Sequence, residues 1–202
     1  MSYRFFLLVQ EALKKLYKTG QFDPSWRYSL AIDVAYDRKK AYTAGILYDM
    51  KNEEVIKIRT AISSIPFPYI PGLLYARETP PILGVAEDLK FDLLIVNGHG
   101  RLHPRRAGLA TMAGILLDVP SIGVANKLLC GEVMGKEKVN PVILDGKVEG
   151  FEVVLNKGRF YISPGNFLDA EAVYEFIRLR NFKYPRELEL ADRESKKLKK
   201  SS

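Results

Sequence analysis

The chain contains very little cysteine, histidine or tryptophan, and no apolar run long enough to cross a membrane. Cys130 is the only cysteine, which excludes an intrachain disulfide bond and a cysteine-rich zinc site. The apolar segment 5–9 is short and lacks a signal-peptide cleavage site. We therefore expect a soluble, cytoplasmic protein with no attachment to a membrane.

Acidic residues are outnumbered by basic ones. The 24 Asp and Glu stand against 31 Lys and Arg, which gives a formal net charge of +7 and an isoelectric point near 9.3. A basic surface attracts polyanions, and nucleic acid is the commonest soluble polyanion. Solvated surface lysines explain the same excess equally well. The charge is thus consistent with a nucleic-acid partner but does not require one.

The whole chain, residues 1–202, is expected to form one domain. Its hydrophobic content of 47% suffices for a substantial core, and we find no linker, repeat or low-complexity insert. Residues 1–28 are predicted to form an N-terminal helix, over 3–17, and a connector. Residues 193–202 are expected to be a basic tail. We expect the protein to be a monomer.

The order of the remaining elements predicts an α/β fold. Strand-like runs at 29–36, 41–49 and 53–60 have short connections, which indicates an antiparallel meander. Short apolar runs at 93–96 and 121–125 are typical of buried parallel strands. Two more strands are expected at 150–155 and 159–162, with helices at 73–89 (broken or kinked at Pro80 and Pro81), 106–117 and 169–180. We therefore expect a mixed sheet, with three antiparallel strands and then parallel strands, covered by helices on both faces.

Two carboxylates are candidate metal ligands. Asp33 lies in the middle of an apolar strand, where a bare charge is costly unless it is solvated, paired or bound to metal. Glu78 follows Arg77 in the predicted helix. Together these side chains offer the hard oxygen ligands that Mg²⁺ prefers. An outward-facing Asp33 and a merely solvated Glu78 remain the ordinary alternatives.

A stiff, aromatic segment precedes that helix. Its prolines restrict the backbone on either side of a tyrosine, and its glycine permits a tight turn. Such a projection can insert between bases or stack on one. A plain connector whose tyrosine packs on the core is the alternative. The segment is Pro68-Tyr69-Ile70-Pro71-Gly72.

A glycine-rich loop follows the first predicted parallel strand, at the end of the sheet where α/β proteins place their ligands. It consists of Asn97-Gly98-His99-Gly100, and the glycines permit close backbone approach to a base or phosphate. His103 then precedes Arg105 and Arg106 at a predicted helix start, which is a reasonable phosphate-binding arrangement. A polar loop with a basic helix start fits these residues equally well.

Taken together, these motifs resemble the endonuclease V family. PYIPG is followed by RE, by a strand ending in a G-x-G loop, by HPRR, and by Ile122-Gly123-Val124-Ala125. The order and spacing resemble the family over about residues 30–180, and Ser163-Pro164-Gly165 falls where the family has its last active-site loop. The resemblance implies a ribonuclease H-like fold.

The resemblance also implies a function. The family uses Mg²⁺, with Mn²⁺ as an alternative, to cut DNA or RNA at the second phosphodiester on the 3′ side of hypoxanthine. By this resemblance Asp33, Glu78 and Asn97 occupy the metal and catalytic positions, and Tyr69 is the tip of a wedge formed by residues 68–72. Residues 98–100 and the backbone near Leu102 and His103 would line the pocket for the flipped base.

Three positions depart from the family pattern. Asn97 replaces a metal-binding aspartate, and Asn166 replaces a histidine near the metals. Asn126 replaces an active-site lysine, although Lys127 follows directly and is a candidate substrate-binding residue. Asn97 is expected to be the most damaging, because two metal ions 3.5–4 Å apart repel and need anionic ligands. Asp169 or Glu171 is a candidate replacement carboxylate.

Three functions remain open. The first is a metal-dependent endonuclease for inosine-containing nucleic acid, slowed by Asn97. The second is a catalytically inactive binder of such strands. The third is a nuclease-like protein that recognises a different modified base.

Overall fold

The computed structural model describes residues 3–202. The helices are α1 (Tyr3–Lys14), α2 (Leu74–Ala86), α3 (Leu109–Leu117), α4 (Ala170–Leu179) and α5 (Arg186–Lys200). The strands are β1 (Tyr28–Tyr36), β2 (Lys40–Asp49), β3 (Glu54–Ser64), β4 (Leu93–Asn97), β5 (Ser121–Ala125), β6 (Glu132–Val133), β7 (Val139–Leu144), β8 (Lys147–Val154) and β9 (Arg159–Pro164).

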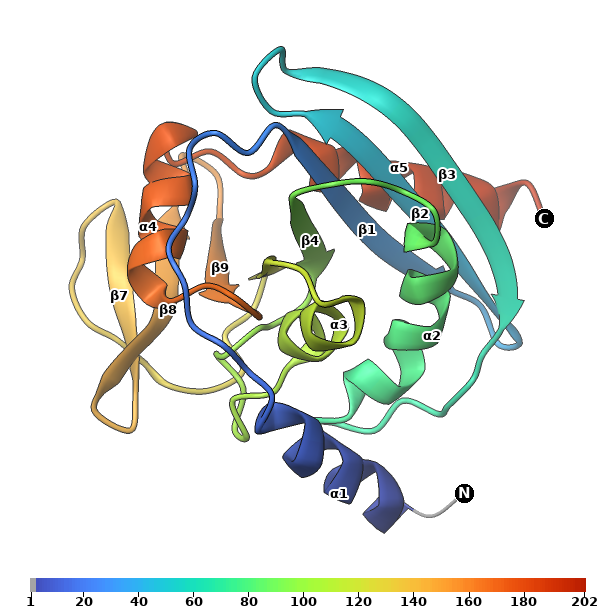
Figure 1. Cartoon of the computed structure of the whole chain (residues 1–202), viewed down its shortest axis with the longest axis horizontal. Helices are drawn as coiled ribbons and strands as arrows, with labels where there is room; N and C mark the ends of the chain where they lie inside the picture. Colours follow the sequence, from blue (N-terminus) through green and yellow to red (C-terminus); the bar gives the residue numbers. More distant parts are fainter. Residues whose placement is uncertain (1–2) are drawn as a thin grey trace.

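All these strands belong to one mixed sheet (Figure 1). Their order is β3-β2-β1-β4-β5-β9-β8-β7-β6. The first three strands form the expected antiparallel meander, and β1, β4 and β5 run parallel to one another. Since parallel strands end at the same edge, the segments after β4 and β5 meet near the end of β1. This edge holds most of the residues singled out from the sequence.

Helices cover both faces of the sheet, as expected. Along β1, Leu30 and Ile32 belong to the core beneath α2 and α3, whereas Ala31 belongs to the core beneath α4. This alternation follows from the two-residue period of a strand, whose successive side chains point to opposite faces. The continuous apolar run of β4 is buried on both sides, as a central parallel strand requires.

Residues 193–202 differ from the expected basic tail, because most of them form the second half of α5. This helix packs on β1 and β2 through Leu188, Ala191 and Ser195, which are fully buried. Their spacing of three and four residues places them on one helix face. The stripe is narrow and the remaining positions are mostly charged, so the segment resembles a solvated tail in sequence.

Other local differences concern element boundaries. Two strands not expected from the sequence, β6 and β7, extend the sheet beyond β8, and Pro141 within β7 obscures the strand pattern. Helix α2 is continuous through Pro80 and Pro81, whereas a break or kink was expected there. Helix α3 begins at Leu109, three residues later than expected.

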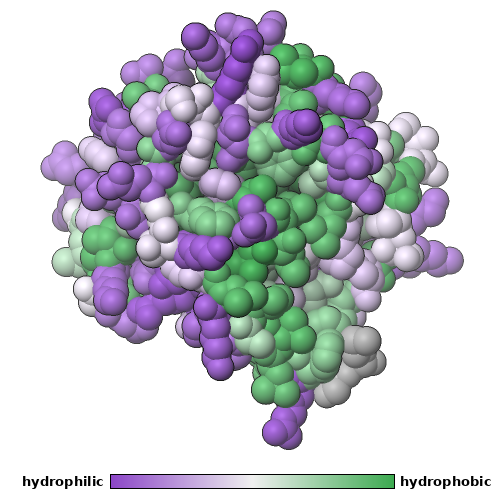
Figure 2. Space-filling model, in the orientation of Figure 1, coloured by the Kyte–Doolittle hydropathy of each residue, from purple (hydrophilic) through white to green (hydrophobic). Residues whose placement is uncertain are grey.

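The N-terminal helix presents apolar side chains on two sides. Phe6 and Leu13 pack against the core beneath α2 and α3. Phe5 and Leu8 are exposed, and Figure 2 shows apolar side chains gathered over α1 at the lower part of the view. Within residues 3–202, no helix has the length and apolar character needed to span a membrane.

Candidate nuclease site

Asp33 and Asn97 lie side by side on neighbouring strands. The β1–β4 register pairs Ile32 with Val96, so each of the two polar residues is one step further toward the shared edge. The Asn97 Nδ2 amide donates a hydrogen bond to Asp33 Oδ1 at 2.7 Å. The structure thus brings into direct contact two of the residues that the resemblance assigns to the metal position.

The other oxygen of Asp33 is held from the opposite end of the chain. Ser195, in α5, donates a hydrogen bond through Oγ to Asp33 Oδ2 at 2.6 Å. Asp33 is 5% exposed and Ser195 is fully buried. Both carboxylate oxygens thus accept from neutral donors, which offsets the cost of burying the charge. Sequence reasoning missed Ser195; the only signal was its place on the same helical stripe as Leu188 and Ala191.

Glu78 faces the same region from α2. Burial, and after it the negative charge of Asp33, raise the pKa of its carboxyl to about 8, although the Tyr36 hydroxyl and the Arg77 guanidinium oppose the shift. The influence of Asp33 on this pKa shows that the two carboxylates are near neighbours. With nothing else bound, Glu78 is protonated at neutral pH.

This arrangement fits a single hard cation better than a metal centre with many protein ligands. Asp33 and Glu78 are a buried pair of carboxylates whose mutual repulsion a divalent cation would relieve. Across residues 3–202 there is no cluster of three or more His, Cys, Asp or Glu side chains suited to a metal. A third protein oxygen would have to come from Asn97, whose amide nitrogen now faces Asp33.

The candidate wedge and the glycine loop border one cavity of about 510 Å³. Three separate segments of the chain meet there: the end of the proline segment, the loop after β4 and the loop after β5. The structure therefore brings together residues that sequence analysis took from distant positions. From the sequence-predicted set the cavity is lined by Tyr69, Pro71, Gly72, Asn97, Gly98, His99, His103, Asn126 and Lys127.

The segment 68–72 is anchored on both sides of its exposed tyrosine. Ile70 packs against the core, whereas the Tyr69 side chain is 67% exposed. Gly72 has φ of +79°, a conformation that other residues adopt at a cost. Its carbonyl accepts hydrogen bonds from Gln10 Nε2 at 3.2 Å and from Arg105 Nη2 at 2.6 Å. The backbone is thereby fixed while Tyr69 projects.

The loop after β4 is tightly packed and carries two neutral imidazoles. A side chain at Gly100 would collide with the carbonyl of Pro164, so this position requires glycine. Burial lowers the pKa of His99. Burial and the nearby charge of Arg105 lower the pKa of His103 to about 4. At neutral pH this side of the cavity is therefore uncharged, and His103 Nδ1 accepts a hydrogen bond from the Arg105 amide at 3.2 Å.

Comparison with known proteins decides the family. A family model described as Endonuclease V matches residues 10–193. The chain belongs to the endonuclease V family. The endonuclease V of Saccharolobus islandicus is 37% identical over 169 residues, which cover 84% of this chain and 81% of that protein.

Solved structures of endonuclease V share the fold, which is ribonuclease H-like as expected. The Streptomyces avermitilis enzyme has 25% identity and a TM-score of 0.90, covering 99% of this chain and 94% of its own. The Ciona intestinalis protein has 19% identity and a TM-score of 0.85, covering 98% of both chains. The latter was solved in complex with a 24mer DNA containing an inosine followed by a ribo-adenosine.

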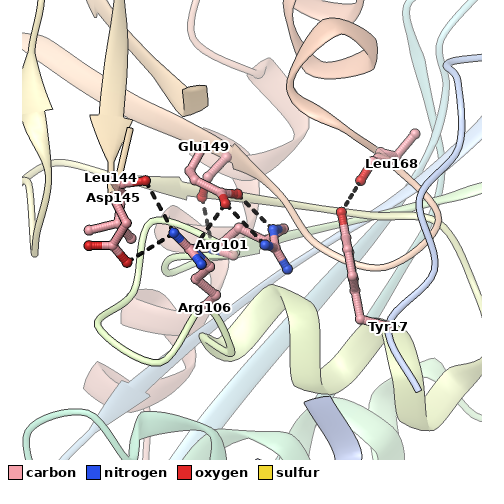
Figure 3. Close-up of polar contacts among 9 residues, drawn as sticks. Tyr17, Arg101, Arg106, Leu144, Asp145, Glu149 and Leu168 are labelled. Atoms are coloured by element: carbon pink, nitrogen blue, oxygen red, sulfur yellow. Dashed lines mark hydrogen bonds and ion pairs between the residues drawn. The ribbon is translucent and has the colours of Figure 1, made fainter. Parts of the chain in front are cut away.

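The phosphate-binding role expected for Arg105 and Arg106 is not supported by the geometry. Arg105 donates to Gln10 Oε1 at 2.6 Å as well as to Gly72. Arg106 pairs with Glu149, as does Arg101 (Figure 3). Glu149 is 5% exposed, and a buried carboxylate of this kind requires cationic partners. These arginines stabilise the loop through contacts within the protein, and α3 begins only after them.

Two further sequence expectations concern the end of β9. Asn166, at the position where the resemblance leads one to expect a histidine, accepts from the Lys18 backbone at 3.1 Å and donates to the Gly114 carbonyl at 3.3 Å. Asp169 caps α4 by accepting from the Ala172 amide at 2.8 Å. Glu171 is exposed in the first turn of that helix. Asp169 is thus engaged as a helix cap and is not a free replacement carboxylate.

Proposed function

We propose that this endonuclease V family member is a metal-dependent endonuclease that acts on DNA or RNA containing hypoxanthine. The observation that supports this most strongly is the shared cavity, which is lined by the exposed Tyr69, by residues 97–99 and His103 of the loop after β4, and by Lys127. A displaced base and its backbone need such a combination of stacking surface, neutral hydrogen-bonding wall and cation.

Base recognition would come from the loop after β4. Gly98, His99 and His103 line the cavity, and the lowered pKa values of the two imidazoles keep this wall uncharged, so it would not attract a purely electrostatic ligand. Tyr69 would occupy the space left by the flipped base, because its ring is exposed and its neighbours are anchored. The Ciona relative bound to inosine-containing DNA supports this choice of base.

Asp33 and Glu78 would hold Mg²⁺, with Mn²⁺ as an alternative, and the Asn97 amide oxygen would be a neutral third ligand. A bound cation supplies charge neutralisation at the phosphate and lowers the pKa of water. Glu78 would have to lose its proton, and the Asn97 amide would have to turn from Asp33. Both requirements weaken metal retention, so we propose slow cleavage, at the second phosphodiester on the 3′ side of the lesion.

A catalytically inactive binder is the second candidate, and one observation favours it. Each carboxylate oxygen of Asp33 accepts a hydrogen bond from a protein side chain, Asn97 or Ser195. Such an arrangement is stable in itself, so the cavity would remain able to bind a strand while the metal position stayed weak.

The two candidates separate in a cleavage assay. Single-stranded DNA and RNA oligonucleotides with one inosine would be incubated with the protein and Mg²⁺ or Mn²⁺, and the products mapped by length. The endonuclease proposal expects one cut at the second phosphodiester 3′ to inosine, absent in Asp33→Ala. Tight binding with no product at any cation concentration would support the catalytically inactive binder instead. Equal cutting of control strands with adenosine in place of inosine would overturn both candidate functions.

A further inference from the structure

A second, larger cavity lies away from the proposed nuclease site. It encloses about 810 Å³ between the connector that leads into β1, the turn after β2 and the segment joining α4 to α5. Figure 1 shows the connector passing alongside α4 before it enters β1. Tyr28 begins β1 next to this cavity, and Asp33 is five residues further along the strand, about 16 Å at 3.3 Å per residue.

The cavity is strongly basic. Five cationic side chains line it, against the single carboxylate of Glu53. Two of the five are neutralised by buried acids: Arg27 pairs with Asp49 at 2.8 Å, and Arg180 pairs with Glu187 at 2.8 Å. The other three form no salt bridge within residues 3–202 and are exposed. They are Lys51, Lys183 and Arg186.

Aromatic rings also line this cavity. Trp26 is half-buried and meets Phe22 edge-on, with ring centroids 5.3 Å apart. Phe22 in turn meets Phe176 of α4 edge-on at 5.7 Å. The position of the Trp26 ring is thus fixed by its contact with Phe22. Tyr48 and Tyr184 continue the aromatic lining.

We propose that this cavity binds a nucleotide, either free or as one unit of a nucleic-acid strand. Lys51, Lys183 and Arg186 would contact phosphate, and the base would lie against Trp26. The combination of unpaired cations with aromatic surface is what single-strand binding sites use, and it is sequence-tolerant because every base has a flat face. The site is independent of hypoxanthine recognition and therefore goes beyond the proposed function.

The chain contains its own reporter for this site. Trp26 is the only tryptophan, so intrinsic fluorescence follows this cavity directly. Wild-type protein would be titrated with thymidine monophosphate, with an oligothymidine strand, with inorganic phosphate and with a polyglutamate peptide. We expect saturable quenching by the strand. Equal quenching by the monophosphate would identify a free-nucleotide site, and quenching by the strand alone a strand site.

Two outcomes would overturn the proposal. The first is unchanged fluorescence with both nucleotide ligands. The second is an equal response to inorganic phosphate or polyglutamate, because it would show an anion or peptide site that makes no use of the base.

Charge variants test the phosphate contacts. Lys51→Gln, Lys183→Gln and Arg186→Gln combined should weaken the fluorescence-detected affinity about tenfold or more. The matched control carries Lys57→Gln, Lys147→Gln and Lys157→Gln, all exposed and outside the cavity, with the same net charge. Equal affinity of the two variants would contradict the proposal. Inosine discrimination should be unchanged in both, which separates this result from that of the proposed function.

Discussion

The Asn97 side chain donates a hydrogen bond of 2.7 Å to Asp33, where other endonuclease V proteins are expected to place a second carboxylate. An amide at this position gives the buried Asp33 carboxylate a hydrogen-bond donor from the protein itself. A carboxylate at the same position would repel Asp33, and a cation would be needed to relieve that repulsion. The identity of this residue therefore decides whether the site is stable when metal is absent.

Asn97→Asp should lower the stability of the metal-free protein and raise its affinity for metal. Two like charges about 4 Å apart repel by about 4 kcal/mol at an effective dielectric constant of about 20, and a bound divalent cation reverses the sign of this effect. We expect the variant to melt lower than wild type in EDTA and to gain more stability on adding Mg²⁺. Differential scanning calorimetry with and without Mg²⁺ measures both changes, and cleavage of inosine strands should rise modestly.

Two controls accompany this variant. Asn156→Asp adds the same charge at an exposed position and should show neither effect. Asp33→Ala in the Asn97→Asp background should abolish any gained cleavage. If Mg²⁺ stabilises the Asn97→Asp variant no more than wild type, Asn97 does not face the metal position.

Ser195→Ala tests the contact between α5 and Asp33. Removing the donor leaves one buried carboxylate oxygen without its partner, which should lower the free energy of unfolding by about 1–3 kcal/mol. Ser201→Ala, at the exposed end of the same helix, should change it by less than about 0.5 kcal/mol. Chemical denaturation of both variants in EDTA gives the comparison; equal stabilities would mean that the Ser195 bond is not formed in solution.

Ser195 also shows what sequence reasoning could not reach. The strands β1 to β5 followed from apolar runs, and Asp33 stood out as a charge within one of them, since these signals are local. Glu78 was singled out chiefly by the resemblance to endonuclease V. The contact between Ser195 and Asp33 joins residues 162 positions apart, and α5 hides its small buried stripe among charges. The sequence likewise could not show that Arg106 is engaged within the protein, because the buried Glu149 with which it pairs lies in another part of the sequence.

Tyr69→Ala should reduce lesion discrimination with little effect on stability. A stacking aromatic contributes about 1–3 kcal/mol per base, whereas a side chain that is 67% exposed adds little to the core. Tyr69→Phe keeps the ring and should retain discrimination. Fluorescence anisotropy with inosine and adenosine strands, together with a melting curve, separates the two effects. A large drop in melting temperature with unchanged discrimination would identify Tyr69 as a packing residue.

His103 should make the protein acid-sensitive. Its pKa is about 4 in the folded state and near 6.5 in the unfolded chain, so acidification favours proton binding by the unfolded chain. The contribution of the neutral His103 to the free energy of unfolding is complete above pH 6.5 and is lost as the pH falls toward 4. Its limit is roughly 3 kcal/mol. Unfolding free energies at pH 7 and pH 4.5 should therefore differ less in His103→Gln than in wild type. Equal differences would mean that His103 is protonated freely in the folded protein.

Equilibrium binding of a matched pair of strands tests the central claim most directly. Two single-stranded oligonucleotides that differ only by inosine in place of adenosine would be titrated with wild-type protein in EDTA, where cleavage cannot intervene. Because phosphate contacts are common to both strands, rising salt should weaken both affinities while preserving their ratio. We predict tighter binding of the inosine strand at every salt concentration. Equal affinities at matched salt would contradict the assignment of the cavity beside Asn97 as the base-recognition site.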